Sequence, residues 1–256
     1  MIGARLVLYG FLVLATLPLA AFGQSHAAKS DLPLAGNSAP TISVRELTIP
    51  EKARDAYNKG IRRFAREDWA GSVGEFQRAI AAYHDFYEAY YKIGLADLEL
   101  RLNGDAQAAF RKSIELSESH FAPALFGLGL TLGNDKQFDD ALAFIRAGLR
   151  LDPASSRGNF TLAWVLYTGD RVSEAEKSAC QAVLYNPNFA MARLLLAQIH
   201  RRQNNAAAMI EDLNAYLRLE PDSPRSAGVK AVRDAAARAL DRNQESVETV
   251  AVGEQQ

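Results

Sequence analysis

Side chains suited to catalysis or metal binding are few in this sequence and stand far apart. Its four histidines are His26, His84, His120 and His200, and no two of them have the short spacing of zinc ligands. We expect His200 to be partly buried with its hydrogen bonds satisfied. The one cysteine, Cys180, is expected to lie on a helix as a small apolar residue. The sequence therefore predicts no metal site and no cofactor.

Acidic pairs are the remaining candidates for acid–base chemistry. Asp139–Asp140 and Glu174–Glu176 fall on the outer faces of predicted helices, where charged side chains are ordinarily solvated. The chain also lacks a phosphate-binding loop, a dinucleotide-binding glycine motif and a nucleophile elbow. We therefore predict that the protein is not an enzyme. A cell-wall-acting enzyme on a helical superhelix is the less favoured alternative, because it needs a buried catalytic glutamate and usually a further domain.

The composition is that of an ordinary soluble protein. The 256 residues are 48% hydrophobic and 23% charged, and the formal net charge is −1. Without an overall basic field, nucleic acid is not an expected partner. A single cysteine forms no internal disulfide, so stability must come from packing.

The first residues of the chain predict export. An almost uncharged apolar run extends from Leu6 to Phe22, after one basic residue, and small residues flank its end, as in a secretory signal peptide. We predict a signal peptide at residues 1–23 and a periplasmic or secreted protein. The alternative is an uncleaved anchor to the inner membrane formed by residues 6–22, a length at the short limit for crossing a bilayer. Membrane contact is expected only in that alternative.

Two further segments lack a helical pattern. Residues 24–47 are rich in Ala, Ser, Pro and Gly, which predicts a flexible linker. Residues 241–256 are polar and have no apolar face, which predicts a disordered tail. The folded part is therefore expected at residues 48–240.

A short phrase recurs at a fixed interval within this folded part. "LRLDP", "VLYNP" and "LRLEP" end at Pro153, Pro187 and Pro221, in two steps of 34 residues. Apolar residues between these prolines have helical spacing. Small residues repeat in steps of 34 or 35 at Gly60, Gly94, Gly129, Ala163, Ala197 and Ala231. The pattern predicts pairs of antiparallel helices that cross closely at the small residues and end at the prolines.

Each pair of helices needs a tight turn, and polar triplets supply candidates. The predicted turns are RED at 66–68, NGD at 103–105, GND at 133–135, TGD at 168–170 and QNN at 203–205. The fifth unit departs most from the pattern, because Met209 and Tyr216 stand where the other units have small residues. Its packing is expected to be looser or altered.

These units resemble tetratricopeptide repeats. The resemblance rests on the 34-residue period, the small residue at the helix crossing, the apolar residue of the second helix and the terminal proline. It covers about residues 53–223 as five units, followed by a capping helix near 224–240. It implies an all-α fold, a right-handed solenoid of helical hairpins whose first helices line a concave groove. Such grooves commonly bind peptides or other proteins.

The positions that the resemblance assigns to the groove are mostly aromatic, and the fifth unit adds arginines. The predicted groove residues are Tyr57, Phe64, Tyr91, Leu95, Phe126, Phe160, Trp164, Tyr167, Arg201 and Arg202, with Ile61, Leu98, Leu130, Leu194 and Gln198 among them. Aromatic residues and arginine are enriched in binding hot spots, so this lining predicts an apolar segment as the ligand, with an acidic flank at the arginines. The alternative is that the rings are core, packed against facing helices.

The sequence therefore predicts a protein–protein interaction scaffold or adaptor in the periplasm or cell envelope, which binds a peptide or protein segment in an aromatic groove. The cation clamp with which some tetratricopeptide domains hold a carboxyl terminus is not expected, because the corresponding positions are Tyr, Phe and Leu. The alternative function is self-association into a homo-oligomer, through an exposed apolar patch or through the irregular fifth unit.

Overall fold

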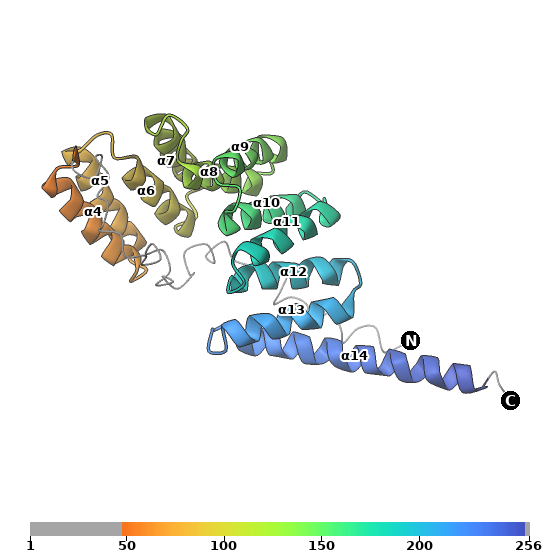
Figure 1. Ribbon diagram of the computed structural model, residues 1–256. Helices are drawn as coiled ribbons and strands as arrows, with labels where there is room; N and C mark the ends of the chain where they lie inside the picture. The colour runs from red at the N-terminus through yellow and green to blue at the C-terminus, as the bar shows by residue number, and fades with distance from the viewer. Residues whose placement is uncertain (1–47, 254–256) are drawn as a thin grey trace, which may run out of the picture. The chain divides into compact units, whose positions relative to one another are not determined.

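The computed structural model describes residues 48–253, and the side chains of residues 48–242. Over this range the regular structure is helical throughout, and short turns join the helices (Figure 1). The helices divide between two compact units, one ending at Pro153 and the other beginning at Ala154. The predicted signal peptide at 1–23 and the predicted linker at 24–47 lie outside the described residues.

Residues 48–153 form three helical hairpins. The pairs are α4 (Glu51–Phe64) with α5 (Trp69–Ala82), α6 (Tyr87–Glu99) with α7 (Asn103–Leu116), and α8 (Ala122–Asn134) with α9 (Phe138–Leu151). The second helix of each hairpin also packs against the first helix of the next one within the unit. This is the stacking of a repeat solenoid, in which each helical hairpin contacts the hairpins next to it in sequence.

Residues 154–253 form two further hairpins and a final helix. The pairs are α10 (Ser156–Thr168) with α11 (Val172–Tyr185), and α12 (Ala190–Arg202) with α13 (Ala206–Leu219). The final helix, α14 (Ser226–Gly253), packs against α13 and runs on beyond it (Figure 1). The prediction of an all-α solenoid of five repeat units with a capping helix is confirmed over the described residues.

The capping helix is longer than predicted. Its backbone is helical through Gly253, so the boundary expected at residue 240 is wrong, and the disordered tail expected from Asp241 is helical as far as that glycine. No proline or glycine interrupts residues 241–252, and glutamate, glutamine, arginine and alanine continue a helix readily.

Small residues lie where paired helices cross, as predicted. A Cβ added to Gly60 would stand 2.5 Å from a ring carbon of Phe76, and one added to Gly94 would stand 2.6 Å from a ring carbon of Phe110. The rings thus occupy the space in which a side chain would lie. Five of the six predicted crossing residues are buried: Gly60, Gly94, Gly129, Ala163 and Ala197.

The sixth predicted crossing residue is wrong. Ala231 is exposed, and α14 instead buries Val229 and Val232. Since α14 has no second helix of its own in the described chain, no crossing requires a small residue there. Its valines share one core cluster with Met209 and Tyr216 of α13. The fifth unit is therefore altered, as predicted, and its two large side chains fill the contact with the capping helix.

All five hairpin turns have the same backbone geometry. One residue in each turn has a positive φ, for example 62° at Lys136. The next residue donates its N–H to the carbonyl five positions earlier, as Gln137 does to Leu132 at 2.9 Å. The positive-φ residues of the five turns are Glu67, Arg101, Lys136, Asp170 and Asn204. None of them is glycine, the residue that adopts this conformation at least cost.

The second hairpin turns earlier than predicted. Its turn lies between Glu99 and Asn103, and the NGD triplet at 103–105 forms the first helical turn of α7. The hydrogen bond from Leu102 N to Asp97 O places this turn in register with the other four. The repeat period therefore decides the position of the turn, and the local turn-forming residues do not.

We predict that Gly94→Ala lowers the free energy of unfolding by about 1–3 kcal/mol, because the new methyl group would overlap the Phe110 ring. Gly74→Ala in α5 is the matched control. A Cβ at Gly74 meets nothing within 4 Å, so the better helix propensity of alanine should stabilise the protein by up to about 1 kcal/mol. Urea unfolding followed by circular dichroism measures both variants, and equal effects would contradict close packing at the crossing.

Lys136→Gly is expected to raise the free energy of unfolding by about 0.5–1 kcal/mol. Glycine relieves the positive φ, and the greater freedom of the unfolded chain cancels part of that gain. Lys136→Ala shortens the side chain and keeps the strained backbone, so it should give no stabilisation. A comparison of the unfolding midpoints tests this. If the alanine variant gains as much as the glycine variant, the lysine side chain is responsible and the backbone is not.

Candidate functional site

Three of the predicted groove residues lie in the core. Tyr91, Phe126 and Phe160 have only 7%, 3% and 4% of their surface exposed. The ring of Tyr91 lies 5.9 Å from that of Phe110 and 5.3 Å from that of Phe121, measured between centroids. The prediction that these three residues anchor a ligand in the groove is wrong, and the alternative that they are core is correct.

Neighbouring helices enclose the two buried phenylalanines. Phe126 of α8 lies against Gly148 of α9, where an added Cβ would stand 2.5 Å from the ring. The ring of Phe160 in α10 lies 5.0 Å from the ring of Phe189, directly before α12. Because the neighbouring helices lie close together, they enclose these two rings in the core.

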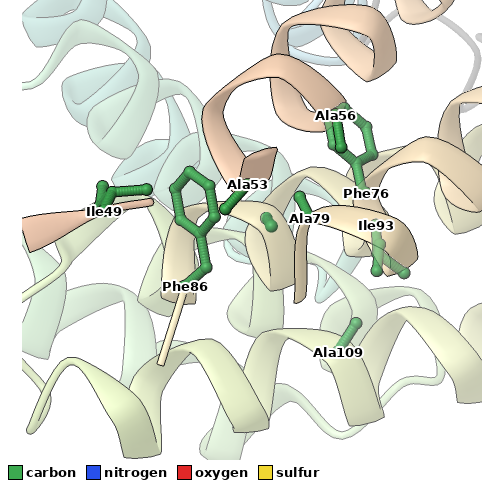
Figure 2. Close-up of a cluster of buried hydrophobic side chains, with 9 residues drawn as sticks. Ile49, Ala53, Ala56, Phe76, Ala79, Phe86, Ile93 and Ala109 are labelled. Carbon is green, nitrogen blue, oxygen red and sulfur yellow. The ribbon is translucent and has the colours of Figure 1, made fainter. Parts of the chain in front are cut away.

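Tyr57 and Phe64 of α4 are half-buried at the edge of the core of the first hairpin. Tyr57 lies 5.5 Å from Phe76 and 4.8 Å from Phe86 between ring centroids, and burial raises the pKa of its hydroxyl well above the usual range. Phe64 meets Trp69 edge-on at 4.7 Å. Figure 2 shows the core cluster in which Phe76 and Phe86 pack against α4. These rings hold the first hairpin together. Leu95, a predicted groove residue on α6 of the second hairpin, is half-buried.

Trp164 and Tyr167 keep more access to solvent. They lie three residues apart on α10, hence on one face, and both are only partly buried. The indole of Trp164 has no hydrogen bond, ring contact or cation contact with any described residue. Tyr167 lies under the guanidinium of Arg202, 5.4 Å from its ring centroid. These two rings are the predicted anchors that the structure leaves available.

Arg202 is engaged within the protein. Its guanidinium donates to Asp170 Oδ1 at 2.6 Å and to the carbonyl oxygen of Tyr167 at 3.2 Å. This contact joins the two hairpins of the C-terminal unit, and it matches the arginine with a carboxylate. Arg201 is half-buried and also interacts within the chain. The structure therefore offers no support for an acidic flank at Arg202, because its charge is already paired.

A partly buried polar network joins α11, α12 and α13. His200 Nδ1 lies 2.8 Å from Asp212 Oδ2, and His200 Nε2 lies 3.3 Å from Glu176 Oε1. Arg193 donates to Asp212 Oδ1 at 3.2 Å, and Gln203 donates to Glu176 Oε2 at 2.6 Å. The partial burial predicted for His200 is confirmed. Its partners were not predicted, because they come from two different hairpins.

Burial raises the pKa of Asp212 above its ordinary value, and the hydrogen bonds from Arg193 and His200 oppose that rise. A buried carboxylate is tolerated when it is paired in this way. Glu176 belongs to this network but keeps 36% of its side-chain surface exposed, and Glu174 of the predicted pair is exposed. Asp139 and Asp140 are exposed, as predicted. The network holds three helices in register, and we assign it a structural role.

Cys180 lies on α11, as predicted, but is exposed. The pKa of the thiol is raised, mainly by partial burial of the sulfur and to a smaller extent by the negative charge of Glu176. Reactive cysteines have a lowered pKa, so this environment does not activate the sulfur. In the part of the chain that the structure describes, no cluster of His, Cys, Asp or Glu is arranged to hold a metal ion. The described helices are likewise too short or too polar to cross a membrane.

Asp97 of α6 is buried, with 6% of its surface exposed. Burial and the nearby charge of Asp105 raise the pKa of its carboxyl to about 6. The equivalent residues of the next two hairpins are Leu132 and Leu166, both buried. A carboxyl thus occupies a place that is otherwise apolar, and its ionised form opposes folding.

Asp97→Asn is expected to stabilise the protein at neutral pH. Since the pKa is raised to about 6 in the folded state, the wild-type chain loses stability as the pH rises from about 4 to about 6, and the loss persists above that range. We expect a gain of about 1–3 kcal/mol at about pH 7 and little gain below about pH 4. Chemical unfolding at both pH values measures it, with the exposed Asp139→Asn as control. The same gain at both pH values would contradict ionisation as the cause.

Solved structures of tetratricopeptide proteins share this fold. A thermophilic tetratricopeptide-repeat protein of Thermus thermophilus is similar with a TM-score of 0.64 and 15% identity, over 72% of this chain and 98% of that one. PilF of Pseudomonas aeruginosa gives 0.59 and 19%, over 73% and 89%. MamA of Desulfovibrio magneticus gives 0.54 and 20%, over 69% and 99%. At such identities the likeness shows the fold alone.

Sequence comparison adds the family. No curated protein sequence matches the chain. The family model described as tetratricopeptide repeat matches residues 91–156 and again residues 157–224, more than half of the chain. Domains of this family generally act as scaffolds that bind other proteins or peptides. With its 34-residue period, its five hairpins and these two matches, the chain belongs to the tetratricopeptide repeat family.

Proposed function

We propose that this protein is an interaction scaffold of the periplasm or cell envelope, and that the face of α10 with Trp164 and Tyr167 binds a segment of a partner protein. Trp164 is the main support for this function. Its indole is partly exposed and bonded to no described residue, although a tryptophan ring offers a large apolar area and an N–H donor. Tryptophan and tyrosine are enriched in hot spots for this reason.

Tyr167 is positioned before any ligand arrives. Arg202 lies over its ring and is itself held by Asp170 at 2.6 Å. A ring that is already fixed loses little conformational freedom on association, which favours binding. The partner segment that fits this face has an apolar side chain for the two rings and a hydrogen-bond acceptor for the indole. The signal-like residues 1–23 support export as the route to the envelope.

Self-association is the second candidate, and a different surface favours it. Leu184 and Tyr185 lie side by side at the end of α11, with 67% and 45% of their surface exposed. Neighbouring exposed apolar side chains are typical of protein contact sites. A second copy of the chain would then contact α11, whereas the main proposal places the partner on α10.

Capture from an envelope extract tests these two surfaces against each other. The bait is residues 24–256, which contains all the described residues of both compact units. We expect the wild-type bait to hold a partner that the Trp164→Ala/Tyr167→Ala bait holds about 30-fold less tightly, as for the loss of a hot spot. The matched control Leu184→Ala/Tyr185→Ala removes apolar surface from α11 of the same unit and should retain the partner.

Circular dichroism must show equal helix content and similar melting for all baits. Trp164→Phe is a second variant that keeps most of the packing and removes only the indole N–H and part of the ring. Loss of the partner with the α11 variant alone would refute the α10 site. The same baits are also tested for capture of an untagged second copy of the chain. If only the α11 variant fails to capture that copy, self-association is the function.

A further inference from the structure

Basic side chains form a row along the outer side of α4. Lys52 and Lys59 are spaced by two helical turns, Arg62 follows one turn later, and Arg66 lies in the turn directly after the helix. All four are exposed, and we call them the basic row. The buried side of the same helix carries Ala53, Ala56 and Gly60.

The basic row has no acidic partner among the described residues. Arg63 of the same helix contacts Asp68 at 2.7 Å and Glu75 at 3.6 Å, so its charge is compensated within the protein. The four side chains of the row make no such ion pair and no hydrogen bond. The acidic residues of α4 are Glu51 and Asp55, fewer than its cations, and the row therefore presents a net positive charge to solvent.

The helix dipole explains only part of this charge pattern. Cations in the last turn stabilise a helix, which applies to Arg62 and Arg63. Lys52 stands in the first turn, where the dipole disfavours a cation, and Lys59 stands in the middle. A ligand outside the chain is therefore the better explanation for the row.

We propose that the basic row of α4 docks onto an anionic phospholipid bilayer. Its place in the chain favours this ligand, because α4 is the first described helix after the apolar run from Leu6 to Phe22, a sequence of the type that directs a chain to a membrane. Only 25 residues, 23–47, separate this apolar run from the first described residue in the sequence.

The composition of the row also favours lipid over an acidic protein. Protein interfaces are centred on aromatic or large apolar anchors, and the other exposed residues of 52–66 are Arg54, Asp55, Asn58, Arg63 and Ala65. Polybasic contacts to lipid headgroups require charge alone. This surface belongs to the N-terminal unit and is independent of the α10 site.

Vesicle sedimentation tests the proposal. The chain of residues 24–256, which lacks the apolar run, is mixed with vesicles of neutral phosphatidylcholine or of phosphatidylcholine with about 30% phosphatidylglycerol. We expect binding to the anionic vesicles alone, weaker at about 0.3 M than at about 0.05 M salt. Lys52→Gln/Lys59→Gln/Arg62→Gln should reduce the partition coefficient about 100-fold, because each cation contributes about fivefold.

A charge-matched control separates the row from net charge. Lys136→Gln/Arg146→Gln/Arg150→Gln removes three exposed cations from the same unit and should bind as the wild type does. Equal loss in the two triple variants would overturn the assignment to α4, and so would a wild-type chain that ignores anionic vesicles. If the first triple variant unfolds, Lys59→Gln alone, expected to weaken binding about fivefold, decides the outcome. The Trp164→Ala/Tyr167→Ala chain should bind vesicles normally, so the two proposals fail separately.

Discussion

Contact between a large side chain and a glycine is the constraint on which the first hairpins depend. The rings of Phe76 on Gly60 and of Phe110 on Gly94 leave no room for a methyl group. Because the helices come this close, side chains on the neighbouring helical face are enclosed as well. Tyr91 is buried for this reason, although its position along the helix is that of a groove residue.

The two compact units meet the same packing requirement with different chemistry. The N-terminal unit fills its crossings with rings and Ile145 set against glycines, whereas the C-terminal unit has alanines there and a polar network around His200 and Asp212. Such a partly buried network contributes most when all its polar groups are paired, so it favours one register of the three helices. The two units are therefore stabilised by different contacts. The basic row belongs to the N-terminal unit, and Trp164 belongs to the C-terminal unit.

The main support for each proposal comes from side chains that form no bond with the described residues. The indole of Trp164 has no hydrogen bond or ring contact with a described residue. Phe160, on the same helix, instead packs its ring against that of Phe189. The basic row likewise forms no ion pair with a described acidic residue, in contrast to Arg63 on the same helix. Side chains left unused by folding are the natural candidates for recognition, since their loss costs the fold little.

The sequence by itself determined the period, the five hairpins, the capping helix and the small residues at the crossings, because each repeat is a local pattern that its own residues encode. Only the tertiary structure decided that Tyr91 and Phe126 are core while Trp164 is accessible, and that Arg202 is paired with Asp170. The physical reason is that core and groove faces repeat with the same helical period. Whether a side chain is buried then depends on how close the neighbouring helix lies and on which side chain of that helix faces it. Both belong to another part of the chain, so the sequence of one repeat does not specify them.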